Sequence, residues 1–194
     1  MESRIVQDLV HWRELYASGA RPDRPPSQWL VDTVAALPND RPLADVAGGT
    51  GRHAVPAARH GHHVVLVDFI EQAVARAREL EAAIDGVVAE VARLPFKAGG
   101  FGVVQVSNFL DRLLFPDLRA LLAPGGCLVY ETYTLEHLDL VQRGLARGPT
   151  TAEYLLRAGE LRELASPLDV IEYWEGEVVD NAGRRCCARL VARS

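Results

Sequence analysis

The chain has 194 residues, of which 48% are hydrophobic and 24% charged, so it is long enough for one domain with a sizeable core and too apolar for intrinsic disorder. Its formal charge of −5 argues against nucleic acid as a partner, because a phosphate backbone is bound by a positive field. No apolar run reaches the roughly 18 residues of a membrane-spanning helix and no signal peptide is recognisable, so we expect a cytoplasmic protein that binds no membrane.

The first forty residues predict a helical flank ahead of the main fold. Four apolar residues share one helical face: Ile5, Leu9, Trp12 and Tyr16. A proline-rich turn follows over 21–26, and apolar spacing resumes over 29–37. We therefore expect one domain over 1–194, with 1–40 as an N-terminal flank or lid. The aromatic residues Trp12, Tyr16 and Trp29 either close over a ligand or pack these helices on the sheet.

Five apolar stretches predict the strands of a sheet. They cover residues 43–46, 64–67, 87–91, 101–106 and 127–130. Helical patterns separate them; between the second and third stretches, apolar residues recur at three- and four-residue steps as far as Ile84. Alternating strands and helices predict a mainly parallel sheet with helices on both faces.

The C-terminal part changes character. Residues 168–179 and 185–191 flank the turn-forming residues 180–183, which predicts a hairpin with at least one antiparallel strand. The expected fold class is therefore α/β: a doubly wound, Rossmann-like, mainly parallel seven-stranded sheet with a C-terminal antiparallel hairpin and an N-terminal helical flank.

A glycine-rich turn directly follows the first predicted strand. Its glycines, Gly49 and Gly51, permit close approach of a ligand to the backbone and to the N–H groups of the following helix. Residues 49–54 also satisfy the dinucleotide pattern G-x-G-x-x-G/A, and Asp68 lies 19 residues after Gly49, near the spacing of a ribose-binding acid. This motif by itself leaves a nicotinamide cofactor open.

Acidic residues at the strand ends favour S-adenosylmethionine (SAM) over a dinucleotide. Asp45 closes the first strand beside the glycine turn, where a carboxylate repels a pyrophosphate and attracts the ammonium group of SAM. Asp68 follows the second strand, and Glu90 near the end of the third is placed to accept from an exocyclic amine. Three acids on consecutive strand ends suit a cationic adenosyl ligand.

Four segments, in order, resemble the motifs of class I SAM-dependent methyltransferases. They are the first motif at 43–53, the second at 64–68, the adenine-side motif at 90–96 and the turn into the fifth strand at 122–128. Their order makes the resemblance far more specific than one glycine turn. Segments 12–16, 108–115 and 153–164 further resemble the bacterial branch that includes tellurite-resistance methyltransferases.

The resemblance implies roles for the first two motifs. Asp45, Ala47 and the turn from Gly49 to Gly51 hold the methionine portion of SAM, Asp68 binds both ribose hydroxyls, and Phe69 packs on the adenine. The chain departs from the family at Ala47, where glycine is common and where the extra methyl group crowds the turn.

The resemblance also implies the remaining contacts. Glu90, which replaces a common aspartate, meets the adenine edge together with Val91. Ser107 and Asn108, with Phe109 beside them, line the sulfonium and the acceptor pocket.

For the binding site of the methyl acceptor, the sequence provides candidate residues only. Methyl transfer from a sulfonium is an in-line displacement, so no catalytic residue is obligatory and the identity of one is unknown. Candidate general bases for a protonated acceptor are His53, Glu131, Tyr133 and His137. Arg112 and Tyr133 are the candidate substrate-binding residues, although arginine supplies 20 of the 21 basic residues.

Histidines and cysteines suggest no metal site. His60, His62 and His63 lie where a helix gives way to a strand, without a cysteine or carboxylate ligand set. The three cysteines lack C-x-x-C spacing and are expected to be reduced thiols. Cys186 and Cys187 are adjacent in a predicted strand, so we expect one to be buried and the other exposed.

Three functions stay open. The first is a methyltransferase that acts on a small-molecule acceptor, as a monomer or homodimer, with S-adenosylhomocysteine as product. The second is an NAD(P)-dependent oxidoreductase that uses the same glycine turn, against which the short chain and Asp45 argue. The third is a SAM-binding protein without turnover.

Overall fold

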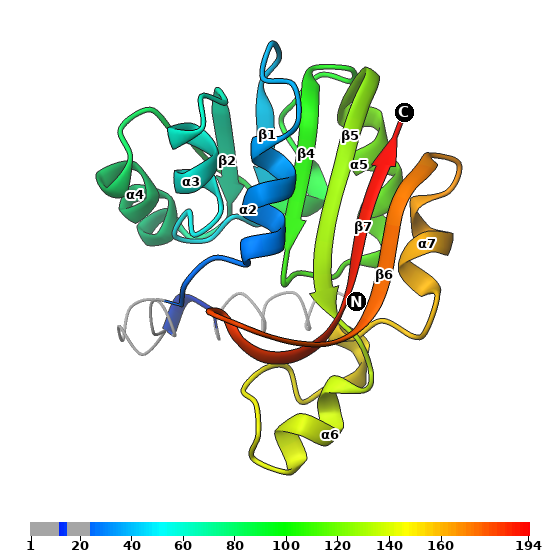
Figure 1. Cartoon of the computed structure of the whole chain (residues 1–194). Coiled ribbons are helices and arrows are strands. Elements are labelled where there is room, and N and C mark those ends of the chain that lie inside the picture. Colours follow the sequence, from blue (N-terminus) through cyan, green and yellow to red (C-terminus); the bar gives the residue numbers. More distant parts are fainter. Residues whose placement is uncertain (1–11, 15–23) are drawn as a thin grey trace.

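A seven-stranded sheet forms the centre of the computed structural model, which describes residues 12–14 and 24–194 (Figure 1). The strand order is β3-β2-β1-β4-β5-β7-β6; β1 to β5 run parallel, and β7 is antiparallel to both β5 and β6. The strands are β1 (Leu43–Val46), β2 (Val64–Asp68), β3 (Asp85–Val88), β4 (Phe101–Ser107), β5 (Leu122–Tyr133), β6 (Asp169–Asp180) and β7 (Gly183–Arg193). This confirms the expected fold class, C-terminal hairpin included.

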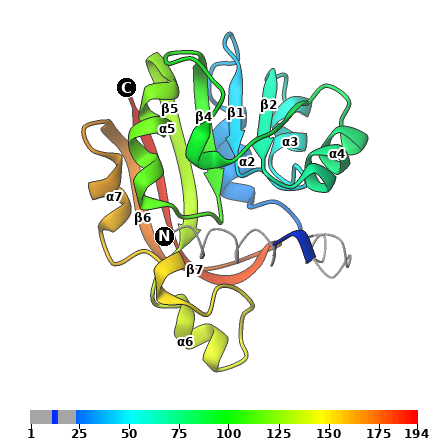
Figure 2. The ribbon, with the colours of Figure 1, turned by 180° about the vertical axis from the view of Figure 1, so that it is seen from behind.

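Helices cover both faces of the sheet. They are α2 (Gln28–Ala35), α3 (Ala54–Arg59), α4 (Glu71–Leu80), α5 (Phe115–Leu121), α6 (His137–Gln142) and α7 (Glu160–Ala165), with 3-10 turns η1 (Val91–Arg93), η2 (Arg112–Leu114) and η3 (Ala152–Tyr154). Figure 1 shows α2 and α3 in front of the sheet, and the reverse view in Figure 2 shows α5 and α7 on the other side. The helix α6 lies beyond the tip of β5.

Alternating side chains of the strands feed two hydrophobic cores. In β1, Leu43 packs into the core that α2, α3 and α4 cover, whereas Ala44 and Val46 pack into the core under α5 and α7. Because the sheet is buried on both faces, all four residues of β1 are buried. No helix among the described residues is long and apolar enough to cross a membrane.

Some element boundaries differ from the sequence prediction. The third strand spans Asp85–Val88 rather than 87–91, because the chain turns into η1 after Val88. The preceding helix ends at Leu80, and Ile84 is apolar because it is buried in the core before β3 rather than because it belongs to the helix. The fifth strand is longer than 127–130, since Leu122 already pairs with Phe101 before the Pro-Gly-Gly turn bulges outward.

The prediction that one of the paired cysteines is exposed was wrong. Cys186 and Cys187 are 7% and 1% exposed, because β7 is covered on both faces: α6 packs against it, and the Cys186 amide donates to His137. The histidines near 60 each have a separate partner. His60 contacts the Pro56 carbonyl, His62 the Val34 carbonyl, and His63 the carboxylate of Asp85.

The aromatic residues of the N-terminal flank differ in their surroundings. Trp29 packs α2 on the sheet, since its indole N–H donates to Glu172 of β6 at 2.8 Å. Trp12 is 37% exposed. Residues 12–14 of the predicted first helix are helical, whereas its other residues, including Ile5, Leu9 and Tyr16, lie outside the described residues.

Candidate functional site

Strand register brings polar side chains together on one face of the sheet. Asp45 pairs with Gln105 of β4, and two residues onward Ser107 pairs with Glu131 of β5. Since strand side chains alternate, Asp45, Gln105, Ser107 and Glu131 point to the same face as Leu43, the face covered by α2 and α3. They lie toward the carboxyl ends of parallel strands, where open α/β sheets bind ligands.

Asp45 is a buried acid with an unused oxygen. Its side chain is 2% exposed, and its Oδ2 has no hydrogen-bond partner. Burial raises the pKa of this carboxyl to about 7, and the nearby Gln105 amide only partly offsets the rise. Both polar atoms of that amide also lack partners. A buried polar atom without a partner costs free energy, so this arrangement is explained best by a ligand that supplies donors.

The glycine turn has a left-handed backbone at three places. The φ angles are +56° at Ala47, +56° at Gly49 and +78° at Gly51. Gly51 also lies so close to α4 that a Cβ there would be 2.8 Å from the Cβ of Ala77. Ala47 does have a Cβ, so its left-handed conformation is strained by about 1 kcal/mol. The crowding expected at Ala47 therefore takes the form of backbone strain.

Asp68 joins the end of β2 to the glycine turn. Its Oδ2 accepts from the Gly49 amide at 2.8 Å, and its Oδ1 accepts from the Ile70 amide at 2.9 Å. The side chain is buried, so its orientation is set before any ligand arrives. The residues predicted to hold the methionine and ribose portions are thus in direct contact through Gly49 and Asp68.

A cavity of about 450 Å³ opens beside Phe69. Its other lining residues are Arg13, Glu14, Glu71, Gln72 and Val88. Phe69 is half-buried and presents an aromatic ring to this space, as the prediction of an adenine contact requires. Arg13 and Glu14 belong to the described part of the N-terminal flank, which therefore borders the cavity.

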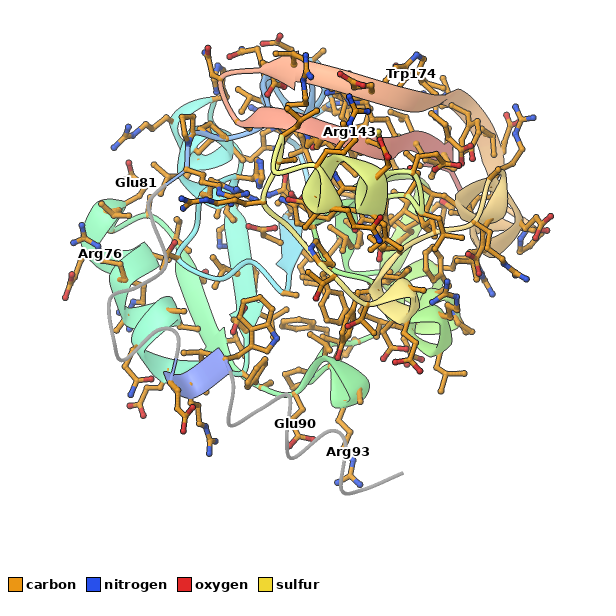
Figure 3. The ribbon with its side chains drawn as sticks, turned by 90° about the horizontal axis from the view of Figure 1, so that it is seen from below. Arg76, Glu81, Glu90, Arg93, Arg143 and Trp174 are labelled. Carbon is orange, nitrogen blue, oxygen red and sulfur yellow. The ribbon has the colours of Figure 1, made fainter. Side chains whose placement is uncertain are left out.

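Glu90 and Val91 follow β3 rather than forming its end. Glu90 is exposed, and Val91 is a half-buried residue at the start of η1. Figure 3 shows Glu90 near Arg93 at the periphery of the molecule. The adenine contact predicted for Glu90 stays a prediction, and its exposed position gives it less support than Phe69 has.

Ser107 and Asn108 end β4 beside β5. Asn108 is the second residue other than glycine with a left-handed backbone, at φ +52°. Its amide donates to the Glu131 carbonyl at 2.8 Å, and its side-chain Nδ2 donates to Ser107 Oγ at 3.2 Å. Strained residues gather at functional sites, and the two non-glycine cases within 12–14 and 24–194, Ala47 and Asn108, both lie at this edge of the sheet.

Arg112 is occupied by the protein itself. Its guanidinium donates to both oxygens of Glu160 and to the carbonyls of Glu153 and Leu155, at 2.7 to 3.0 Å. Four of its five N–H donors are therefore used. This arrangement connects η2 to α7 and η3 and weighs against the predicted contact to substrate.

Glu131 lies in a buried ionic cluster that the sequence did not reveal. Its carboxylate accepts from Arg185, from Arg189 and from the Ser27 hydroxyl at 2.8 to 3.4 Å. Arg185 also binds Asp180 at 2.6 Å. We call Glu131, Asp180, Arg185 and Arg189 the paired cluster. It joins β5 to the C-terminal hairpin and, through Ser27, to the start of α2.

The candidate bases are engaged to different degrees. His53 Nε2 accepts from the Ser27 amide at 3.0 Å, and burial holds the pKa of His53 well below its usual value. His137 is fully buried, its Nδ1 accepts from the Cys186 amide at 3.3 Å, and burial lowers its pKa as well. Tyr133 stacks on His137 with ring centroids 4.4 Å apart. Of these candidate bases, only Tyr133 forms no hydrogen bond through its side chain with the described residues.

Comparison with known proteins gives consistent results. Residues 43–126 match the model of a family described as a methyltransferase domain. The chain is 31% identical over 141 residues to the ribosomal protein L11 methyltransferase of Geobacter metallireducens, covering 70% of this chain and 47% of that protein. It is 30% identical over 109 residues to the demethylmenaquinone methyltransferase of Beutenbergia cavernae, covering 54% and 45%.

The similarity to a solved structure covers more of the chain than the family model does. A SAM-dependent methyltransferase of Methanosarcina mazei has the same fold, with a TM-score of 0.70 at 18% identity, covering 88% of this chain and 98% of that one. The chain spans about half the length of the two curated relatives it matches. Those relatives are named for different acceptors, one for a ribosomal protein and the other for demethylmenaquinone.

Proposed function

We propose that this chain is a class I SAM-dependent methyltransferase that transfers a methyl group from SAM to a small-molecule acceptor. The observation that carries the proposal is the buried Asp45 carboxylate, whose Oδ2 lacks a partner beside the glycine turn. An ammonium group supplies the donors that this oxygen lacks, whereas a dinucleotide pyrophosphate would be repelled. We propose also that residues 1–194 act as one domain, with 1–40 as its flank.

The proposed cofactor contacts follow the site geometry. Asp45 and the turn containing Ala47, Gly49 and Gly51 hold the methionine portion. Asp68, already oriented by the amides of Gly49 and Ile70, binds the ribose.

The adenine lies on the other side of the turn in this proposal. Phe69 packs on the ring in the cavity of about 450 Å³ that Val88 also lines. Glu90 and Val91 approach its edge. This arrangement uses one continuous edge of the sheet from β1 to β3.

The protein's chemical task is alignment and exclusion of water. When bound, SAM supplies an electrophilic methyl group on its sulfonium. Ser107 and Asn108 are proposed to line the place where the acceptor meets this methyl group. The Glu131 carbonyl holds Asn108 in position by accepting from its backbone amide. Alignment of this kind replaces the need for covalent participation of the protein.

We propose that the protein supplies no general base. His53 and His137 each spend the lone pair of one ring nitrogen on a backbone N–H, so a proton there would displace a buried hydrogen bond. The Glu131 carboxylate is neutralised by two arginines. The acceptor is therefore expected to bind in a form that is already nucleophilic, with Tyr133 as a contact.

The surroundings of Tyr133 support a small acceptor. The ring is 8% exposed, and the segment after it folds back so that the Leu156 amide donates to the Tyr133 carbonyl at 3.0 Å. Figure 1 shows the α6 region beyond the tip of β5. We propose that this segment restricts the approach to Asn108, which favours a small molecule over a side chain on a folded protein.

Calorimetric titration tests the cofactor. We expect S-adenosylhomocysteine to bind and NADH to show no binding, and we expect Asp68→Ala to weaken S-adenosylhomocysteine by about 100-fold, because two ribose hydroxyls lose a charged acceptor. The matched control is Asp85→Ala, an exposed acid on the neighbouring strand, which should leave the affinity unchanged. Binding of NADH instead would favour the oxidoreductase.

Turnover tests the acceptor. Release of S-adenosylhomocysteine from SAM is measured with panels of small thiols, amines, phenols and carboxylates, and in parallel with ribosomal protein L11. We expect turnover with a member of the small-molecule panels. Turnover with the protein alone would overturn the proposed acceptor class, and tight binding without turnover on any acceptor would favour a non-catalytic SAM-binding protein.

A further inference from the structure

Arg112 and Glu160 form an ion pair that joins three segments beside the carboxyl ends of β4 and β5. The guanidinium donates from Nε to Glu160 Oε1 at 2.7 Å and from Nη2 to Glu160 Oε2 at 3.0 Å. It also donates to the carbonyls of Glu153 at 2.8 Å and of Leu155 at 3.0 Å. One planar group therefore connects η2 with η3 and with the start of α7. We call Arg112 and Glu160 the brace.

The carboxylate of the brace is a fixed anchor. The side chain of Glu160 is 4% exposed, whereas that of Arg112 is 37% exposed. Glu160 also accepts from the backbone amide of Arg157 at 2.8 Å and from the Arg157 side chain at 3.2 Å. The hydrogen bonds from Arg112 lower the pKa of Glu160 to about 2. The carboxylate is therefore ionised at neutral pH and is held by donors on several sides.

The brace lies where β4 and β5 separate. The pairing of these strands ends at Ser107 and Glu131. Directly afterwards Asn108 turns the chain with a left-handed φ of +52°, whereas β5 continues to Tyr133. These are the two segments that the proposed function places around the acceptor. Arg112 belongs to the first of them, four residues after Asn108.

The partners of Arg112 belong to a segment that packs on the end of β5. The Leu156 amide donates to the Tyr133 carbonyl at 3.0 Å, and the Leu156 carbonyl accepts from the Leu135 amide at 2.9 Å. Leu156 is fully buried in the same hydrophobic core as Leu110. The brace thus connects the loop after β4 to the residues that fix the backbone of Tyr133.

We propose that the brace positions Asn108 relative to Tyr133 and so sets the width of the opening through which the acceptor meets the methyl group. This inference rests on the proposed function, and it makes Arg112 and Glu160 positioning residues that contact neither cofactor nor acceptor. A left-handed residue other than glycine persists where its surroundings fix it. A misplacement of about 1 Å at a reacting group can cost about 100-fold in rate, so a rigid connection here has a functional effect.

Loss of the brace should loosen this edge of the sheet without unfolding the protein. In Glu160→Gln the partly exposed Arg112 can be hydrated in place of its lost partner. The apolar packing of Leu110 and Leu156 is unchanged. The effect on binding can therefore be measured on a folded variant, and the Tm of each variant confirms this.

The experiment compares two nucleosides that differ at the position of the methyl group. Sinefungin has an amino-substituted carbon in place of the methylated sulfur of SAM, whereas S-adenosylhomocysteine leaves the methyl position empty. Asn108 Oδ1 accepts no hydrogen bond from the described residues and is the expected partner of the sinefungin ammonium group. Both nucleosides are titrated calorimetrically into the full-length chain and its variants.

Loss of the brace should affect sinefungin selectively. We expect Glu160→Gln to weaken sinefungin by about 10-fold and to leave S-adenosylhomocysteine within about twofold. Arg112→Lys should do the same, because one ammonium group cannot serve a carboxylate and two carbonyls together. The matched control is Glu163→Gln, an exposed acid of the same helix, which should change neither affinity.

A double-mutant cycle tests whether the brace acts through Asn108. Asn108→Ala should itself weaken sinefungin, and adding Glu160→Gln should then cause no further loss. A brace that only stabilises the fold would weaken sinefungin equally in both backgrounds.

Each other outcome overturns the positioning role. Equal weakening of both nucleosides by Glu160→Gln would mean that the brace supports the whole edge of the sheet. Unchanged sinefungin affinity in Glu160→Gln, or wild-type affinity in Arg112→Lys, would mean that Asn108 is held without the brace. Failure of the wild type to bind either nucleoside would remove the proposed function itself, a result distinct from the others.

Discussion

The paired cluster and two other charged residues, Asp45 of β1 and Arg52 of the glycine turn, which we call the open pair, differ in how completely the protein satisfies their charges. In the paired cluster, Glu131 has three donors, and Arg185 bonds to both Glu131 and Asp180. In the open pair, Asp45 retains an oxygen without a partner and Arg52 has none among the described residues. Both groups are buried or half-buried, so depth in the protein does not distinguish them.

This difference distinguishes charged residues that stabilise the fold from charged residues that are available to a ligand. The paired cluster connects β5, β7 and the end of β6, and its Arg189 guanidinium lies 5.2 Å and 5.4 Å from the rings of Trp29 and Trp174. Its interactions are complete without a ligand. The open pair carries unfavourable desolvation that no partner among the described residues offsets.

The largest expected effect comes from breaking the paired cluster. Glu131→Gln leaves Arg185 and Arg189 without their shared carboxylate inside the protein, so we expect the free energy of unfolding to fall by about 3 to 5 kcal/mol. Urea denaturation followed by circular dichroism measures the change.

A surface pair provides the control for that measurement. Glu79→Gln removes the exposed partner of Arg76 on α4, and we expect a change below about 0.5 kcal/mol. If Glu131→Gln were as mild as Glu79→Gln, the paired cluster would not be the structural element described above.

The acid of the open pair, Asp45, should make the stability of the protein depend on pH. The pKa of Asp45 is raised to about 7 in the folded protein from an ordinary value of 3.8. Between these values the folded protein holds a proton that the unfolded chain has released. The contribution of Asp45 to the free energy of unfolding therefore falls as pH rises through this window, by at most about 1.4 kcal/mol per pH unit. The buried His53 and His137, whose pKa values are lowered, contribute a change of the opposite sign below their ordinary value of 6.5.

Ligand affinity should follow the opposite direction. An ammonium group binds the ionised carboxylate, so S-adenosylhomocysteine affinity is expected to rise by up to about tenfold per pH unit as the pH approaches 7, and then to level off. Asp45→Asn should remove the pH dependence of affinity and the Asp45 part of the pH dependence of stability, while Asp40→Asn, which changes an exposed acid before β1, should retain both. Titrations and denaturation series from pH 5 to pH 8 measure both, and an unchanged slope in Asp45→Asn would assign the proton to another group.

The sequence predicted the frame of the molecule well for a specific reason. The first, second and fourth strands are apolar runs bounded by turn-forming residues, so their limits could be placed to within a residue. The hairpin likewise follows from the turn between Asp180 and Gly183. Local signals sufficed for these three strands, whose side chains are buried or half-buried on both faces of the sheet.

The paired cluster could not be predicted, because it depends on register. Glu131 and Arg185 are 54 residues apart and meet only through the pairing of β5 with β7. Glu131 was a candidate base for that reason, and Arg112 was a candidate for substrate although its donors serve Glu160. For the surroundings of Asp45, one signal was present in the sequence. Gln105 interrupts the apolar run of β4, directly opposite Asp45.

The smallest expected effect concerns the turn that separates the open pair. Ala47 has a φ of +56°, which glycine adopts without strain. Ala47→Gly should raise the free energy of unfolding by about 0.5 to 1 kcal/mol, the relief of strain exceeding the added freedom of the unfolded chain. Ala82→Gly, in an exposed turn with ordinary backbone angles, should lower it by a similar amount. If both variants lost stability equally in urea denaturation, the left-handed turn would hold no strain, and the unfavourable free energy at this site would reside in the charges of Asp45 and Arg52 alone.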